Sequence, residues 1–189
     1  MATLYVIETG PTVWDQQQRL ESAAGAPLAP EAVEYLQAAA IELSTQAIKA
    51  VYAASGEAER QAATLLADAL AIKTRSRKDL RELDFGMWQG LTVDDIRRRQ
   101  PKVYKQWTDA PASVCPPGGE SLDEAMTRLR TVTKEIVSKH KGESTLLVLR
   151  PVAMELLQSL LEHRDLRDFW QRVQAPPGWN QYEMNATVL

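Results

Sequence analysis

The hydrophobic positions in the first third of the chain alternate between strand-like and helix-like spacing. Residues 4–7 form a short apolar run that ends at Gly10 and Pro11, which predicts a buried strand followed by a turn. From Pro30, a residue that favours the first turn of a helix, apolar residues recur at three- and four-residue steps: Val33, Leu36, Ala40, Leu43 and Ala47. Residues 50–53 predict a second strand. A second helix then carries Ala58, Ala62, Leu65, Leu66 and Ala69 on one face.

The remaining part of the chain repeats this alternation. Ser121 and Glu124 match a capping box, and the helix predicted after them has one apolar stripe, made of Leu122, Met126, Leu129, Val132 and Ile136. Residues 145–149 form an unbroken apolar strand, and Pro151 can open the next helix. We expect Val152, Leu156, Leu157, Leu160 and Leu161 to face inward from that helix, and residues 186–189 to form a final strand.

Strands that alternate with helices predict an α/β fold with three layers, in which helices cover both faces of a mostly parallel sheet. A length of 189 residues suits a single domain spanning residues 1–189. In such sheets ligands bind beyond the carboxyl ends of the strands, so the residues that follow Ile7, Ala53 and Leu149 are the candidates for chemistry.

Composition and charge exclude several classes of function. The chain is 44% hydrophobic and 25% charged, with a formal net charge of −3, so it lacks the positive field that gathers nucleic acid or an anionic membrane surface. The basic run 97–99 is interpreted as the solvated face of a short helix. No apolar run approaches the ~20 residues of a membrane span, and we expect a cytoplasmic protein.

Common catalytic motifs are missing from the sequence. There is no glycine-rich dinucleotide motif and no phosphate-binding P-loop, and no cofactor is expected. The only histidines are His140 and His163 and the only cysteine is Cys115, so neither a metal site nor a disulfide framework is expected. We interpret Cys115 as a small loop residue and both histidines as surface or helix-end residues.

Three segments give the chain a family resemblance. Residues 4–15 (LYVIETGPTVWD), 80–90 (LRELDFGMWQG) and 116–121 (PPGGES) resemble, in order and spacing, the most recognisable stretches of the histidine phosphatase (phosphoglycerate mutase-like) superfamily. The resemblance covers nearly the whole chain. It implies a phosphoglycerate mutase-like fold and, for an active member, phosphomonoester hydrolysis or mutase activity.

The resemblance also implies where an active site would lie and how this chain departs from it. In the family the first strand runs into Arg-His-Gly, whose histidine is the nucleophile, whereas this chain has Glu8 and Thr9 at those two positions. Ala58 stands where the family has a second arginine, and Arg150 stands where it has a second histidine. Of the family's catalytic set only the acid is kept, as Glu82. No catalytic residue is therefore expected at this degenerate pocket.

The replacements change the electrostatics of phosphate binding. Phosphoryl transfer depends on arginines and histidines that stabilise negative charge. A carboxylate at Glu8 would repel a phosphate oxygen at ~4 Å by about 4 kcal/mol at an effective dielectric of 20. Thr9 would need a nearby base to act as a nucleophile. We predict instead that Glu8 and Arg150 form a salt bridge across the pocket.

Three functional hypotheses follow. The first is a catalytically inactive histidine phosphatase-like protein with a binding or regulatory role toward a protein partner or a small molecule; the oligomeric state is open, and an edge strand could support a homodimer. The second is a phosphatase or mutase with an altered site that uses Glu82 as acid/base and Arg150 as anion anchor. The third is binding of a cationic or neutral small molecule, with Glu8 and Glu82 as acceptors. Glu82 and Thr9 also have a structural interpretation, as side chains that satisfy backbone groups.

Overall fold

The computed structural model describes residues 1–21 and 25–184 and contains a five-stranded sheet in the order β3-β2-β4-β1-β5. The sheet is mostly parallel, and β5 is the strand that runs antiparallel to its neighbour β1. The strands are β1 (Ala2–Glu8), β2 (Ile48–Ala53), β3 (Thr74–Ser76), β4 (Ser144–Leu149) and β5 (Trp179–Met184).

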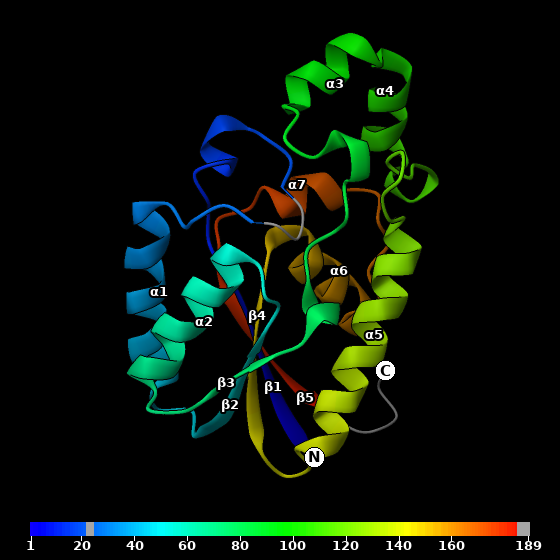
Figure 1. Ribbon diagram of the computed structural model, residues 1–189. Coiled ribbons are helices and arrows are strands. Elements are labelled where there is room, and N and C mark those ends of the chain that lie inside the picture. The colour runs from blue at the N-terminus through cyan, green and yellow to red at the C-terminus, as the bar shows by residue number, and fades with distance from the viewer. Residues whose placement is uncertain (22–24, 185–189) are drawn as a thin grey trace.

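Helices cover both faces of the sheet (Figure 1). The pair α1 and α2 lies on one face and the pair α5 and α6 on the other, while α3 and α4 form a lobe beyond the carboxyl ends of the strands. The helices are α1 (Pro30–Leu43), α2 (Glu57–Ala69), α3 (Val93–Arg99), α4 (Pro101–Asp109), α5 (Leu122–Lys139), α6 (Pro151–Leu161) and α7 (Phe169–Val173). This is the predicted three-layer α/β architecture.

Alternation along β1 explains how one sheet supports two cores. Leu4 and Val6 pack into the core under α5 and α6, whereas Tyr5 and Ile7 pack into the core under α1 and α2. All four side chains are almost fully buried. A central strand with two apolar faces is the pattern expected for a covered parallel sheet.

Local signals placed α1, α2, α5 and α6 correctly, whereas α4 and α7 were not predicted. The Ser121 hydroxyl accepts from the Glu124 backbone N–H and the Glu124 carboxylate accepts from the Ser121 N–H, which confirms the capping box of α5. Pro30 and Pro151 open α1 and α6 as predicted. The predicted helix from Pro30 ends at Leu43 and does not reach Ala47, whose φ of 50° lies in the left-handed region.

The C-terminal strand is the main difference from the sequence expectation. The predicted strand at 186–189 lies outside the described residues. The final strand that the structure describes is β5, which is largely exposed and polar, so neither periodicity nor an apolar run marks it. The short edge strand β3, exposed at all three positions, also went unpredicted.

Three further expectations concern the surface. Arg97, Arg98 and Arg99 end the short helix α3 and pair with Asp94 and Asp95, which confirms a solvated face. The Cys115 thiol is free and exposed in a loop. No helix in the described part of the chain is both long and apolar enough to cross a membrane.

Candidate functional site

The candidate site lies at the carboxyl ends of β1 and β4, as the topology predicted. β1 and β4 are parallel neighbours, and each is followed by a turn at this edge. After β4 the chain enters α6 directly, with Arg150 as the residue that precedes the first helical turn. After β1 it passes through a long connection to α1, which supplies Thr12, Asp15 and Glu21.

Arg150 occupies the centre of the site. Its side chain is only 3% exposed. Nη2 lies 2.8 Å from Oδ2 of Asp15, 3.1 Å from Oδ1 of the same residue and 3.5 Å from Oε2 of Glu21. Nη1 lies 3.4 Å from the Thr9 hydroxyl and 3.3 Å from the Gly10 carbonyl oxygen, both long for hydrogen bonds. The chain's own carboxylates therefore take up this guanidinium.

The connection after β1 is organised around the same carboxylates. The Thr12 backbone N–H and hydroxyl donate to Asp15 Oδ2 at 2.7 and 2.8 Å, and the hydroxyl also lies 2.6 Å from Glu21 Oε2. Glu21, 4% exposed, accepts a further bond from the Ala26 backbone N–H. Asp15 and Glu21 are thus fixed in place before any ligand arrives.

Glu82 caps the amino terminus of α6. Its Oε1 accepts from the backbone N–H groups of Leu83 (2.7 Å) and Ala153 (2.8 Å), and its Oε2 accepts from Val152 (3.0 Å). Burial raises the pKa of Glu82 to about 7, opposed by Arg150 and by these backbone donors. Helix amino termini bind anions, and here a side chain of the chain occupies that position. The structural interpretation of Glu82 agrees with this geometry.

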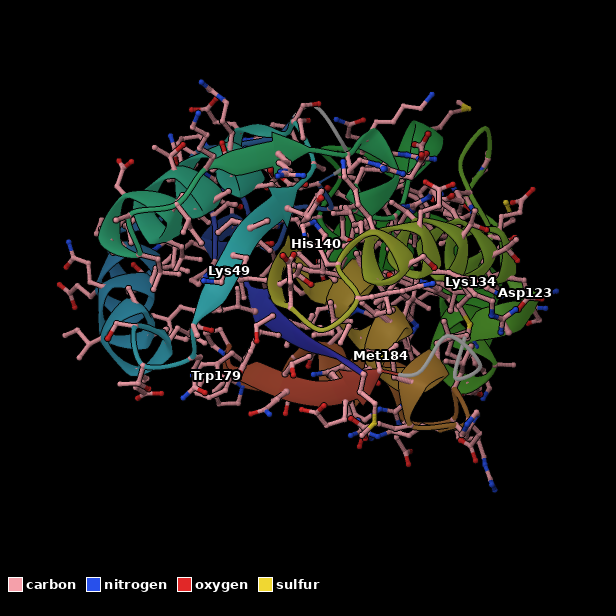
Figure 2. The ribbon with its side chains drawn as sticks, turned by 90° about the horizontal axis from the view of Figure 1, so that it is seen from below. Lys49, Asp123, Lys134, His140, Trp179 and Met184 are labelled. Carbon is pink, nitrogen blue, oxygen red and sulfur yellow. The ribbon has the colours of Figure 1, made fainter. Side chains whose placement is uncertain are left out.

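Among the residues that the structure describes, no base hydrogen-bonds to the Thr9 hydroxyl. The hydroxyl donates to the Gly10 carbonyl oxygen at 2.9 Å, and the side chain is completely buried. Neither histidine follows the carboxyl end of a strand: His140 precedes the start of β4, and His163 follows the end of α6. Figure 2, a view from below, shows His140 beside β2 and α5. Thr9 therefore satisfies backbone, as its structural interpretation predicted.

His140 is a helix-end residue, one of its two predicted interpretations, and it is buried. It was predicted to be a surface or helix-end residue, and it does follow α5, but it is only 5% exposed. Its Nε2 lies 2.9 Å from the Tyr52 hydroxyl and its Nδ1 lies 2.6 Å from Glu143 Oε2. The bond to Tyr52 ties the end of α5 to β2, and the bond to Glu143 joins it to the residue that precedes β4.

The predicted Glu8 to Arg150 salt bridge is wrong. Glu8 of β1 lies opposite Leu149 of β4. Arg150 is the next residue after Leu149, so it is offset by one position from Glu8. Because successive side chains of a strand point to opposite faces, Glu8 and Arg150 are directed to different sides. Glu8 instead lines a cavity beside α6, and within the described residues its carboxyl makes no ion pair. Burial raises its pKa to about 8.

The remaining predicted position lies at the start of α2. Ala58 is fully buried and contributes no polar group. Its neighbour Glu59 is 2% exposed, and burial raises its pKa. Together with Glu21 and Glu82, Glu59 makes a third buried carboxylate around one buried guanidinium.

Sequence reasoning missed Asp15, Glu21 and Glu59. Asp15 stood within a segment that carried the family resemblance, but a charge there has no visible partner until the fold is known. In the described part of the chain no three His, Cys, Asp or Glu side chains converge as a potential metal site. The carboxylates of this edge bond to Arg150 and to backbone donors, and burial raises the pKa of Glu59 and Glu82.

Comparisons with known proteins agree on the family. The model of the histidine phosphatase superfamily (branch 1) matches residues 4–187. Phosphoserine phosphatase 1 of Hydrogenobacter thermophilus is 24% identical over 170 residues, which cover 90% of this chain and 81% of that protein. The bifunctional protein Rv2228c of Mycobacterium tuberculosis is 30% identical over 158 residues, covering 83% of this chain and 43% of that protein.

Solved structures share the fold. The Bacillus stearothermophilus protein YhfR superposes with a TM-score of 0.88 at 23% identity, over 98% of this chain and 92% of that one. A phosphoglycerate mutase of Bacillus anthracis gives a TM-score of 0.77 at 20% identity, over 96% and 88% of the two chains. Since the family model spans almost the full sequence, the chain belongs to the histidine phosphatase superfamily.

Proposed function

We propose that this protein is a non-catalytic member of the superfamily, a pseudophosphatase that keeps the scaffold for binding. One observation carries the proposal: the groups at this edge that could hold a phosphoryl group are bonded to the chain's own carboxylates. Asp15 and Glu21 hold the Arg150 guanidinium, and Glu82 holds the amino terminus of α6. A phosphate would have to displace carboxylates that are already fixed by Thr12 and by backbone.

The chemistry of the remaining groups supports the same conclusion. A nucleophile must have an activated lone pair, and the Thr9 hydroxyl donates its hydrogen to a carbonyl with no base in contact. Transition-state charge on a phosphoryl group needs cationic donors. Glu21, Glu59 and Glu82 instead lie around a single guanidinium, that of Arg150, and Glu8 adds another carboxyl group at the same edge of the sheet, so the potential there disfavours a dianion.

The altered-enzyme hypothesis rests on Glu82 and Arg150. A pKa of about 7 would suit an acid/base, but Glu82 already accepts three backbone hydrogen bonds. Serving as an acid would require Glu82 to give up part of the α6 cap. We therefore rank this hypothesis second.

The test is turnover and phosphate binding by the purified protein. We expect no hydrolysis above buffer across a panel of phosphomonoesters, and no shift of the protein's NMR spectrum with millimolar inorganic phosphate or vanadate. Turnover abolished by Glu82→Gln but kept by the matched surface change Glu34→Gln would overturn the proposal. Turnover that both variants retain would indicate a contaminating phosphatase.

A reconstruction variant gives the positive control. Glu8→Arg, Thr9→His, Ala58→Arg and Arg150→His would restore the residue types that the family resemblance implies. The structure adds two changes, because removing Arg150 strands the carboxylates of Asp15 and Glu21: these are Asp15→Asn and Glu21→Gln. Turnover gained by the combined variant would show that the scaffold still supports the chemistry and only the site was lost.

A further inference from the structure

A polar cavity lies beside α6, separate from the Arg150 site described above. It has a volume of about 240 Å³ and is enclosed by the end of β1, the outer side of α6 and the connection between α7 and β5. Glu8 lies at one wall, Met154 and Glu155 belong to α6, and Gly178 closes it from the β5 side. The volume falls below the roughly 300–1,000 Å³ typical of ligand pockets, so a small metabolite would fit.

The positive charges in its wall are already compensated. Arg172 and Arg164 both reach Glu155, which is only 6% exposed, through Nε and Nη1 respectively. Arg172 also donates to the Asp165 carbonyl oxygen, and Arg164 pairs with Glu162. These arginines therefore fasten α6 to the segment that follows it, and they leave little positive charge for an anionic ligand.

Glu8 is the exception in this wall. Within the described residues its carboxyl accepts no hydrogen bond and forms no ion pair, although it is more than half buried. Burial raises its pKa to about 8, as expected for a carboxyl group that has lost water without gaining a partner. A cationic donor that entered the cavity would supply the missing partner.

We propose that this cavity binds a small organic ammonium compound whose charged group pairs with Glu8. The inference rests on the proposed function, because a chain that used this edge for phosphoryl transfer would have no use for a free carboxylate at Glu8. The cavity takes only the ammonium end and a short neutral body, with Met154 and Pro151 against the carbon atoms. A second negative group on the ligand would meet Glu155.

The first experiment compares two isosteric probes by NMR at pH 8.5, where Glu8 is mostly ionised and a primary amine is still protonated. We expect 4-amino-1-butanol to shift resonances around Glu8, Met154 and Gly178, with a dissociation constant on the order of 1 mM. The neutral analogue 1,4-butanediol should bind at least about tenfold more weakly, the loss expected for a charge-assisted bond. Equal binding of both probes, or of neither, would overturn the proposal.

Variants locate the binding. Glu8→Gln should weaken 4-amino-1-butanol by about tenfold or more, whereas Glu34→Gln removes the same charge from exposed α1 surface and should change nothing. If Glu8→Gln fails to fold, Gly178→Leu replaces it, since a Cβ at Gly178 meets no atom within 4 Å and the larger side chain can occupy the cavity mouth. If Glu8→Gln or Gly178→Leu binds 4-amino-1-butanol with unchanged affinity, the compound does not bind in this cavity.

A zwitterion separates recognition by Glu8 from recognition by the arginines. β-Alanine carries the same ammonium with a carboxylate, and we expect it to bind more weakly than 4-amino-1-butanol. Tighter binding of β-alanine would mean that Arg164 and Arg172 select an anion, contrary to the proposal. These results are independent of the phosphomonoester panel, so amine binding can fail while the protein is still inactive, and activity can appear while amines still bind.

Discussion

Arg128 of α5 and Arg150 at the start of α6 are both nearly buried and both paired with carboxylates, but their guanidinium groups are bonded differently. Arg128 uses all three nitrogens: Nε and Nη2 bind Glu120 at 2.8 and 2.7 Å, and Nη1 donates to two backbone carbonyls. Arg150 has a buried Nε with no hydrogen-bond partner in the described chain, and its two bonds from Nη1 are long.

The surroundings differ as well. Arg128 pairs with one carboxylate, that of Glu120. Arg150 has several carboxyl groups in its surroundings, and the pKa values of Glu8, Glu59 and Glu82 among them are raised. Arg128 is a finished structural bridge between α5 and the segment around Arg81. The Arg150 region, in contrast, concentrates buried charge that packing alone does not require.

The largest expected effect is the loss of Arg150. Arg150→Met leaves the buried Glu21 and the partly exposed Asp15 without a counter-charge, so we expect the free energy of unfolding at pH 7.5 to fall by about 3 kcal/mol in urea denaturation. Adding Asp15→Asn and Glu21→Gln should recover most of that loss. If the single variant is as stable as the wild type, the ion pairs around Arg150 do not hold this edge together.

A smaller loss is expected at Arg128. Arg128→Met removes the bonds to Glu120 and to the Asp79 and Arg81 carbonyl oxygens, but these groups lie near solvent that can replace some of them. We expect a decrease of about 2 kcal/mol, measured in the same denaturation experiment. A larger loss here than at Arg150 would reverse the comparison.

The pH dependence of stability comes next in size. The ordinary pKa of a glutamate is 4.5, and burial raises Glu8 to about 8 and Glu82 to about 7. At pH values between the ordinary pKa and the raised pKa, the folded chain keeps protons that the unfolded chain has released. The free energy of unfolding therefore falls as pH rises through this range. We expect a decline on the order of 1 kcal/mol per pH unit from pH 5 to 8. Glu8→Gln should reduce the decline in the upper part of this pH range. A free energy of unfolding that rises with pH would contradict the raised pKa values of Glu8 and Glu82.

The smallest effect sets the baseline for losing any arginine. Arg97 is exposed at the end of α3 and pairs with Asp94 three residues earlier. Exposed pairs of this kind contribute little, so Arg97→Ala should change the free energy of unfolding by less than about 0.5 kcal/mol. A larger change would mean that the other two values include a general effect of removing positive charge.

Much of the fold could be predicted because its signals are local. The capping box at Ser121, the prolines at 30 and 151 and the apolar runs of the central strands each specify their element without distant information. β5 could not be predicted in the same way, because it is an edge strand with mostly polar, exposed side chains. Its place depends on pairing with β1, which local pattern does not reveal.

The location of the candidate site could be predicted from the sequence, but the ion-pair partners of Arg150 could not. The resemblance directed attention to the ends of β1 and β4, and Glu82 and Arg150 do lie close to one another there. The pairing of Arg150 failed because it depends on strand register, which decides the face to which each side chain points. Asp15 and Glu21 come from a connection whose path over the sheet has no periodic signal.

The position of β1 affects how the chain can fold during synthesis. This strand is synthesised well before its neighbours β4 and β5, because Glu8 pairs with Leu149 and Ile7 with Trp179. Contacts so distant in sequence form late and slow folding. The apolar strand β1 therefore has two unpaired edges until β4 and β5 have been synthesised, which exposes it to aggregation during that interval.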